Sequence, residues 1–418
     1  MKPLNKLRCI LLAMLIPFVF ISKAQDYLDH YLVQAAENNP GLRASFSEYM
    51  AAMEKVPQVK ALPDPQIAFG YFIQPVETRL GPQQAKISVM QMFPWFGTLG
   101  AKEDATAAMA RSKYEAFEEA RSKLYYEVRS TYFNLYFTDK AIDITSENIG
   151  ILNSFRKLAL ARVEAGLASA VDVLRVEMEI ADLENQLAML KDKLAAQRTG
   201  FNNLLNTGEE DPVLVPEVLE ANVLEFSGTT VLDSIRRKNH QVLQLDLMRS
   251  AYQNQEKAAI RTGMPTFSLG IDYRFIGDGT DSQAAVPDAG RNAIVFPMVS
   301  ITVPLYRKKY RSMVQEAVYL QEATMNRKEN KINVLESVYA STEKEYNDAG
   351  RRIPLYEAQS DRAEKSMNIL ESEYATEGKN FEEILRMERQ LLKYRLELEK
   401  ARADQNAAVA FIHYLMGK

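Results

Sequence analysis

Residues 173–194 have the sequence VLRVEMEIADLENQLAMLKDKL, which gives the clearest indication of the fold. Its apolar residues are spaced alternately three and four positions apart: Val173, Val176, Ile180, Leu183, Leu187, Leu190 and Leu194. This spacing is the seam of a heptad repeat, in which one stripe of a helix packs against another helix. The stretch is therefore predicted to be a helix that pairs with a second long helix.

The same seam recurs 211 residues further along the chain, in ILRMERQLLKYRLELEKA, residues 384–401. Its apolar positions are Ile384, Met387, Leu391, Tyr394, Leu398 and Ala401, and after a break at Gln405 they resume at Ala408, Ile412 and Leu415. A helix-breaking segment precedes each seam, EAGLAS at 164–169 and EGKN at 377–380. Two matches at almost one offset indicate a tandem duplication.

A much longer helix is predicted before each of these glycine segments. The first covers about residues 99–164 without a proline, which at about 1.5 Å per residue gives a length of roughly 100 Å. The second covers about residues 308–377, with an interruption and a kink expected near Gly350 and Pro354. Helices of this length cannot bury themselves in a globular core. We expect them to form antiparallel hairpins, with a glycine turn at each tip.

Two segments ahead of the long helices change from helical to strand periodicity. Residues 266–275 alternate apolar and polar side chains, and residues 66–74 do the same with one exception, Phe72. Partner strands are predicted at 85–93 and 295–303, with loops near 75–84 and 276–292. Each half of the chain therefore contributes one β-hairpin.

The predicted strands have the length that a tilted strand needs to cross a bilayer. Four strands cannot close a barrel with a useful lumen, and open sheet edges are not tolerated in lipid. The strands of several subunits must therefore combine. The alternative is a pair of amphipathic hairpins on a soluble core, but no other segment is predicted that could cover their apolar faces.

The N-terminus has the features of a secretory signal peptide. Basic residues precede an apolar run at 10–21, and Ser22 and Ala24 give a cleavage site, so the mature chain is expected to begin near Gln25. A membrane-anchoring helix is the alternative. The predicted organisation is a signal peptide at 1–24, a first repeat at 25–212 and a second at 213–418. No later segment has about 18 consecutive apolar residues, so the mature chain would be soluble, peripheral or a β-barrel.

Composition argues against catalysis and against nucleic-acid binding. The single cysteine, Cys9, lies in the predicted signal, so a mature chain could form neither a disulfide nor a thiolate metal site. The three histidines, His30, His240 and His413, are too far apart for common zinc motifs, and no nucleotide-binding or hydrolase motif is present. A net charge of −4 gives no basic patch for nucleic acid. We expect no enzyme activity, catalytic residue, cofactor or metal site.

The duplicated order of short helices, β-hairpin, long helix, glycine turn and heptad helix resembles the TolC-type outer-membrane efflux family, the outer membrane factors of tripartite efflux pumps. The motifs that carry the resemblance are ALPDP at 61–65 and FPWFG at 93–97, with counterparts GMP at 263–265 and VPLY at 303–306, and the tip segments GLASAVDVL at 166–174 and GKNFEEIL at 378–385. FPWFG is similar to the branch of the family that is paired with heavy-metal pumps.

The resemblance implies a mainly α-helical fold with a small β part. Long antiparallel helical hairpins would form an α-barrel in the periplasm, and the two β-hairpins would give four strands to a twelve-stranded outer-membrane β-barrel shared by a homotrimer. The other partners implied are outer-membrane lipid, a periplasmic adaptor (membrane fusion) protein and an inner-membrane pump. The location would be the outer membrane of a Gram-negative bacterium, extending into the periplasm.

The resemblance also places candidate functional residues at the two hairpin tips. The adaptor contacts would be Gly166, Leu167, Ala168 and Ser169 in the first tip and Gly378, Lys379 and Asn380 in the second. Asp172 and Glu383 match the acidic positions near the periplasmic constriction, where three-fold symmetry would make each a ring of like charges. Alternatively, both are solvated outer-face residues. The second tip is one residue shorter, so the correspondence there is uncertain by one position.

The function implied is a passive conduit that exports small molecules or metal cations. The channel of a type I protein secretion system is an alternative within the same class. A periplasmic coiled-coil scaffold or adaptor is an alternative of a different class, although an adaptor would not carry a β-hairpin ahead of each long helix.

Overall fold

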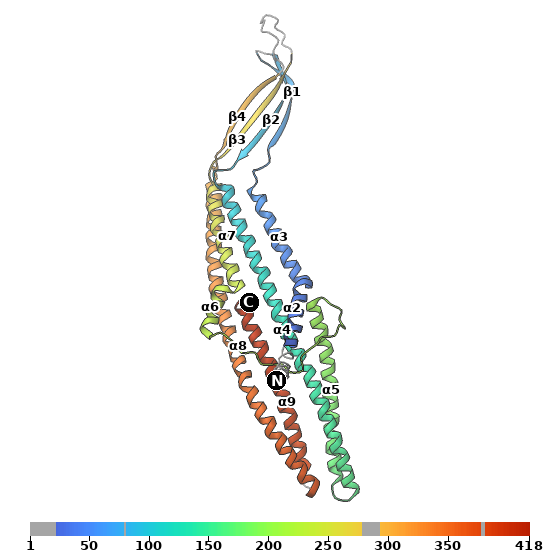
Figure 1. The fold of residues 1–418 in the computed structure, drawn as a ribbon. Helices are drawn as coiled ribbons and strands as arrows, with labels where there is room; N and C mark the ends of the chain where they lie inside the picture. The colour runs from blue at the N-terminus through green and yellow to red at the C-terminus, as the bar shows by residue number, and fades with distance from the viewer. Residues whose placement is uncertain (1–21, 79–80, 278–292, 378–380) are drawn as a thin grey trace, which may run out of the picture. The chain divides into compact units, whose positions relative to one another are not determined.

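The computed structural model describes residues 22–78, 81–277, 293–377 and 381–418. Two helices, two strands, a long helix and a further helix follow one another twice along the chain (Figure 1). In the first half they are α2 (Ser22–Asn38), α3 (Pro40–Lys60), β1 (Gln66–Thr78), β2 (Gly81–Phe93), α4 (Thr98–Glu164) and α5 (Ala170–Leu205). In the second they are α6 (Gly228–Lys238), α7 (His240–Thr262), β3 (Thr266–Ile276), β4 (Ala293–Thr302), α8 (Arg307–Glu377) and α9 (Phe381–Leu415).

The contacts divide the chain into two compact units, each built from both halves of the sequence. Unit 1 takes the described residues up to Ser45 together with Phe117–His240 and Ile332–Lys418, and unit 2 is Phe46–Ala116 and Gln241–Lys331. The predicted signal peptide lies mostly outside the described residues. The repeat boundaries at 25–212 and 213–418 stay a prediction.

The two long helices have 67 residues in α4 and 71 residues in α8. Pro354 lies inside α8, which continues as a helix on both sides, so the predicted interruption near Gly350 and Pro354 is wrong. A proline removes one backbone donor without ending this helix, and Arg352, two residues before it, forms ion pairs on either side. Its guanidinium lies 2.9 Å from Asp348 on the same helix and 2.8 Å from Asp404 on α9. No helix in the described ranges has both the length and the hydropathy of a membrane span.

The helices of unit 1 pack through the two predicted seams. Every seam position is buried or half-buried, and the most enclosed are Val176, Ile180 and Leu183 in α5 and Ile384, Leu391, Ala401, Ile412 and Leu415 in α9. Two clusters of buried apolar side chains form the core, one around Tyr132, Tyr136 and Phe201, the other joining α4, α5, α8 and α9. The burial of these positions agrees with the predicted seams in both copies.

The segment between the two halves, residues 206–227, has no helix or strand and is fixed by buried side chains. The Asn202 amide donates hydrogen bonds to the carbonyls of Gly208, Glu209 and Asp211 at 2.9–3.1 Å. The Asn406 amide donates to the Glu220 carbonyl at 2.9 Å. Side-chain amides therefore supply the backbone partners that regular structure would otherwise give.

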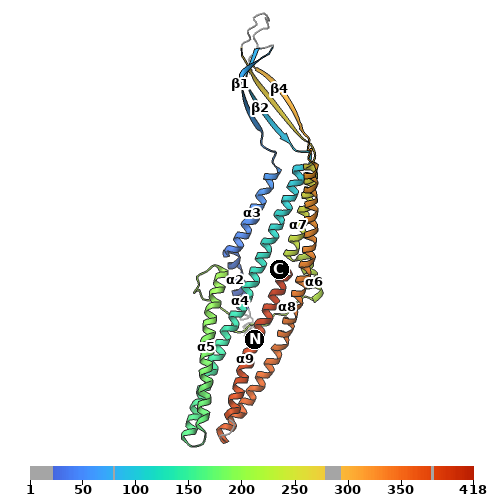
Figure 2. The same ribbon diagram turned by 180° about the vertical axis from the view of Figure 1, so that it is seen from behind.

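Unit 2 contains an antiparallel sheet with the strand order β1-β2-β3-β4, so β1 and β4 form its edges (Figure 2). The first pair of strands is longer than predicted, and only residues 79–80 separate them, so the loop expected at 75–84 is wrong. A bulge explains the difference. Pairing stops after Tyr71, Pro75 has no backbone N–H to donate, and the ladder resumes at Val76 opposite Gln83.

The two faces of the sheet differ in polarity. One face carries exposed apolar side chains in register across the strands: Ile67, Phe69, Tyr71, Ile87, Val89, Leu269, Ile271, Tyr273, Phe275, Val295, Val299 and Ile301. The opposite face carries the polar residues Ser88, Ser268 and Asp272, all buried, together with some apolar side chains, of which Phe296 is exposed. A single chain therefore leaves a continuous apolar surface uncovered, which marks an interaction surface.

Substitution on these two faces should have unequal effects. Ile271 is 55% exposed on the apolar face, and its neighbour Asp272 is 2% exposed on the other. If the apolar face contacts lipid, Ile271→Arg should cost about 2–4 kcal/mol and impair membrane assembly, measured as heat-resistant oligomer in outer-membrane fractions. Asp272→Asn keeps size and polarity and should assemble normally. Equal tolerance of both changes would mean that the two faces are wrongly assigned.

Candidate functional site

The first helical hairpin turns at Gly166, as the sequence places it. Gly166 has φ +71°, and the Leu167 amide donates to the Arg162 carbonyl at 2.9 Å, which closes the end of α4. Ser169 is the N-cap of α5, and its hydroxyl accepts from the Val171 amide at 3.2 Å. The turn conformation requires a residue that tolerates positive φ. The second predicted tip, Gly378, Lys379 and Asn380, lies outside the described residues.

Apolar side chains are exposed at the first tip. Leu167 is 64% exposed, and Val171, Leu174 and Met178 are exposed on α5, whereas Ala168 is half-buried. We call Leu167, Val171, Leu174 and Met178 the tip patch. The helical members are three and four residues apart and share one face of α5 outside the heptad seam. Sequence reasoning named Leu167 but missed the others, although apolar residues off the seam were the available signal.

The two predicted gate acids are each next to an arginine of the same chain. The Asp172 carboxylate lies 3.8 Å from the Arg175 guanidinium, which is also 3.1 Å from Glu382 at the start of α9. Glu383 forms an ion pair with Arg386. Arg175 therefore links α5 to α9. Sequence reasoning missed both arginines, although each follows its acid by three residues, the spacing of helical ion pairs.

A second contact joins the ends of the hairpins. The Arg162 guanidinium lies 4.8 Å from the centre of the Tyr374 ring and donates to the Tyr374 carbonyl at 2.7 Å. The Tyr374 ring lies 4.9 Å from that of Phe381. Burial raises the pKa of Tyr374, and the Asp172 charge raises it further. Asp172 therefore acts electrostatically on a side chain of α8, and these contacts connect α4, α8 and α9.

Glu388 of α9 is a buried carboxyl group in the same helical bundle. It is 3% exposed and accepts a hydrogen bond from the Asn148 amide of α4. Burial raises the pKa of Glu388 to about 7. Arg395 opposes the shift, and the charges of Glu371 and Glu147 add to it. This carboxyl group is the described residue of the bundle best placed to change charge near neutral pH.

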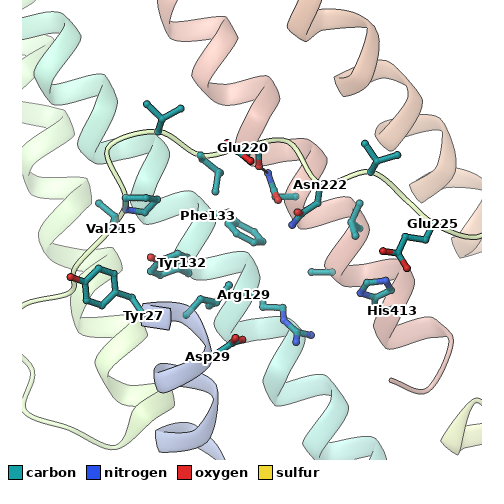
Figure 3. Close-up of a pocket in the computed structure, with 18 of the residues that line it drawn as sticks. Tyr27, Asp29, Arg129, Tyr132, Phe133, Val215, Glu220, Asn222, Glu225 and His413 are labelled. Carbon is teal, nitrogen blue, oxygen red and sulfur yellow. Dashed lines mark hydrogen bonds between the residues drawn. The ribbon is translucent and has the colours of Figure 1, made fainter. Parts of the chain in front are cut away.

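A pocket of about 880 Å³ lies in unit 1 among α2, α4, the 206–227 segment and α9 (Figure 3). The figure shows Arg129 and Asp29 near each other, and His413 near Glu225. Burial lowers the pKa of Arg129, and Asp29 opposes that shift. Burial, followed by the Lys418 charge, lowers the pKa of His413.

This pocket does not have the composition of a metal centre. Among the described residues no group of three or more His, Cys, Asp or Glu side chains is arranged to hold a metal ion. The lining combines aromatic rings with charges of both signs, including Lys418 placed 3.8 Å above the Phe226 ring. Sequence reasoning missed the pocket because its walls come from segments far apart in the chain.

Comparison with known proteins agrees with this architecture. Residues 31–207 match the model of a family described as outer membrane efflux protein. No curated protein matches the sequence. Among solved structures, the outer-membrane channel OprN is similar with a TM-score of 0.77 and 17% identity, covering 94% of this chain and 90% of its own.

Two further structures are similar. CusC, described in terms of folding and transmembrane channel formation, has a TM-score of 0.77 and 14% identity, covering 93% of this chain and 92% of its own. The outer membrane protein VceC from Vibrio cholerae has a TM-score of 0.76 and 16% identity, covering 94% of this chain and 97% of its own. These likenesses show a shared fold, that of outer-membrane channels with paired helical hairpins and a small sheet.

The first half of the chain therefore resembles the outer membrane efflux protein family over residues 31–207, and the chain shares the fold of these solved channels. The matched proteins are described as channels or outer-membrane proteins.

The stability of the helical bundle should depend on the protonation of Glu388. Because its pKa is raised from 4.5 to about 7 in the folded chain, burial carries no ionic penalty below pH 4.5. Between pH 4.5 and about 7 this penalty grows and lowers the free energy of unfolding. The full loss, reached above pH 7, is on the order of 2 kcal/mol after partial screening. Wild-type protein should therefore lose thermal stability between pH 5 and pH 8, measured by circular dichroism at 222 nm.

Glu388→Gln is the matched control, because glutamine keeps the side-chain oxygen that accepts from Asn148. The variant should be more stable than wild type at pH 8 and equal to it near pH 5. If the thermal stabilities of the two proteins changed in parallel with pH, the pKa of Glu388 would not be raised in the folded chain, and the prediction would be wrong.

Proposed function

We propose that this chain is the outer-membrane channel subunit of a tripartite efflux system, a passive conduit that assembles as a homotrimer. In this arrangement three copies of the four-stranded sheet close into one barrel in the outer membrane of a Gram-negative bacterium. The helical hairpins form the wall of a periplasmic passage. An inner-membrane pump supplies the energy, and a periplasmic adaptor connects that pump to this subunit.

The observation that carries the proposal is a sheet that one chain cannot complete. Its apolar face is exposed along all four strands, and β1 and β4 have no further strand beside them among the described residues. In lipid the backbone groups of such edges need partners, and closure into a barrel supplies them. Neighbouring copies offer β1 to β4 pairing without any change in the sheet. The family description supports the outer membrane as the location.

Exposed side chains at the strand–helix junctions of unit 2 also support contact with lipid. Phe96 precedes α4, and Leu305 and Tyr306 precede α8, and all three are exposed. The Trp95 ring stacks on that of Phe267 with the centroids 5.9 Å apart. Aromatic residues are enriched at both membrane–water interfaces of barrel proteins. The junctions therefore fit one boundary of the bilayer.

The tip patch supports the adaptor part of the proposal. Its exposed apolar side chains, with Met178 and Leu167 the most exposed, have no cover within the described chain. A periplasmic coiled-coil scaffold or adaptor, the alternative of a different class, would leave the apolar sheet without a role. Type I protein secretion uses the same kind of channel and differs in the exported substrate.

Leu167→Asp should separate docking from assembly. A carboxylate at this position would have to be desolvated against an apolar partner surface, which costs several kcal/mol and weakens docking. The turn itself and the β-sheet should be unaffected. Efflux-dependent resistance should therefore fall while the abundance of the trimer in the outer membrane stays at the wild-type level.

Gly166→Val provides the contrasting variant. A β-branched residue at φ +71° strains the turn, so abundance and resistance should fall together. Full export by Leu167→Asp would show that the first tip is not the adaptor contact.

The conduit function itself is tested by deleting the gene and restoring it on a plasmid. Deletion should lower resistance to small toxic compounds or metal salts and leave the secretion of proteins unchanged. Lost protein secretion with unchanged resistance would instead favour the type I secretion alternative.

A further inference from the structure

Three charged side chains lie close together on the polar face of the sheet. Lys86 of β2 is directly opposite Arg274 of β3, and the next row on this face pairs Ser88 with Asp272. Glu77 is the other charged residue of the four strands, and it pairs with Pro82, one position from Gln83. The Gln83 side chain contacts Arg274, so the register places Glu77 on the opposite face.

Lys86 extends over β1 and not away from the sheet. Its register partner there is Gly70, and a Cβ atom on Gly70 would lie 3.3 Å from both Cγ and Cε of Lys86. The lysine stem therefore occupies the space that a side chain at position 70 would fill. This contact holds the ammonium group along the polar face.

Arg274 extends toward β4. Its guanidinium lies 5.7 Å from the centre of the Phe296 ring, and Nη1 is 3.5 Å from the Gln83 amide oxygen. Nη2 lies 3.6 Å from the Asp272 carboxylate. The Asp272 side chain is 3% exposed, whereas that of Arg274 is 33% exposed. The carboxylate is thus covered, and the cation reaches the surface.

We propose that Lys86 and Arg274 form a cationic belt inside the barrel and make the channel favour anionic solutes over cations of equal size. This inference rests on the proposed function, because only closure of the barrel turns the polar face into a lumen. Each chain contributes two cations and one buried anion, so three-fold repetition leaves a ring with a net positive charge. Rings of Arg and Lys side chains select anions in other pores.

The belt assigns a substrate class to the conduit. A potential of one kT raises the local anion concentration about threefold and lowers that of cations by the same factor. Free metal cations would have to cross the belt against this positive potential. Anionic or neutral compounds would cross it without opposition. The similarity of residues 93–97 to the heavy-metal branch is therefore not a guide to charge preference at the barrel.

The test is the reversal potential of the purified trimer in a planar lipid bilayer that separates unequal KCl concentrations. Wild type should show a chloride-to-potassium permeability ratio above one. Lys86→Gln combined with Arg274→Gln should lower that ratio about threefold or more, because the belt then keeps only Asp272. Asp272→Asn should raise it, and Lys86→Arg, which retains the charge, should leave it unchanged. The differences should shrink in concentrated salt.

A reversal potential that is the same in wild type and in the double glutamine variant would overturn the belt while leaving the channel itself intact. Potassium selectivity in wild type would also overturn it. Absence of conductance from correctly assembled trimers would overturn the proposed conduit and the belt together. These failures are distinguishable, because only the last removes the current.

Discussion

In a lipid bilayer each backbone N–H and C=O group needs a hydrogen-bond partner within the protein, because lipid tails offer none. This constraint explains why the sheet of one chain needs further strands beside it. Its four strands are paired with one another, carry one apolar and one polar face, and end in two open edges. In the proposed trimer, closure by further copies would satisfy the edges and place the apolar face against lipid at the same time. The polar face would then line a lumen, where Lys86 and Arg274 could act on passing solutes.

The long helices follow from a related need. A helix of about 70 residues has too much apolar surface to stand alone, and the heptad seams of α5 and α9 cover it by pairing. Ion pairs between helices, such as Arg175 with Glu382 and Arg352 with Asp404, fix how the hairpins meet. Single surface ion pairs contribute little to stability, so the main effect of these pairs is on the alignment of one helix along the next. The raised pKa of the buried Glu388 carboxyl group predicts that the packing of α9 on α4 is sensitive to pH.

Periodicity in the sequence was sufficient for the seams, the strand faces and the Gly166 turn, because each depends on residues close together in the chain. Periodicity failed at single prolines, where the surrounding residues of the helix or strand determined the structure. Pro354 does not interrupt α8, and Pro75 produces a bulge instead of a loop. Periodicity could not predict contacts between segments that are far apart in the chain. The Arg162–Tyr374 contact, the pocket around Arg129 and the pairing of Lys86 with Arg274 all depend on register or on three-dimensional packing.

The sheet of one chain has two open edges, and we propose that three copies complete the barrel. Native mass spectrometry of the protein, extracted from outer membranes in mild detergent, tests this oligomeric state. A single dominant species with three times the mass of the mature chain is the predicted result. A monomer that stays dispersed in the same detergent, with no larger species, would contradict it, because its open strand edges would then need no partner.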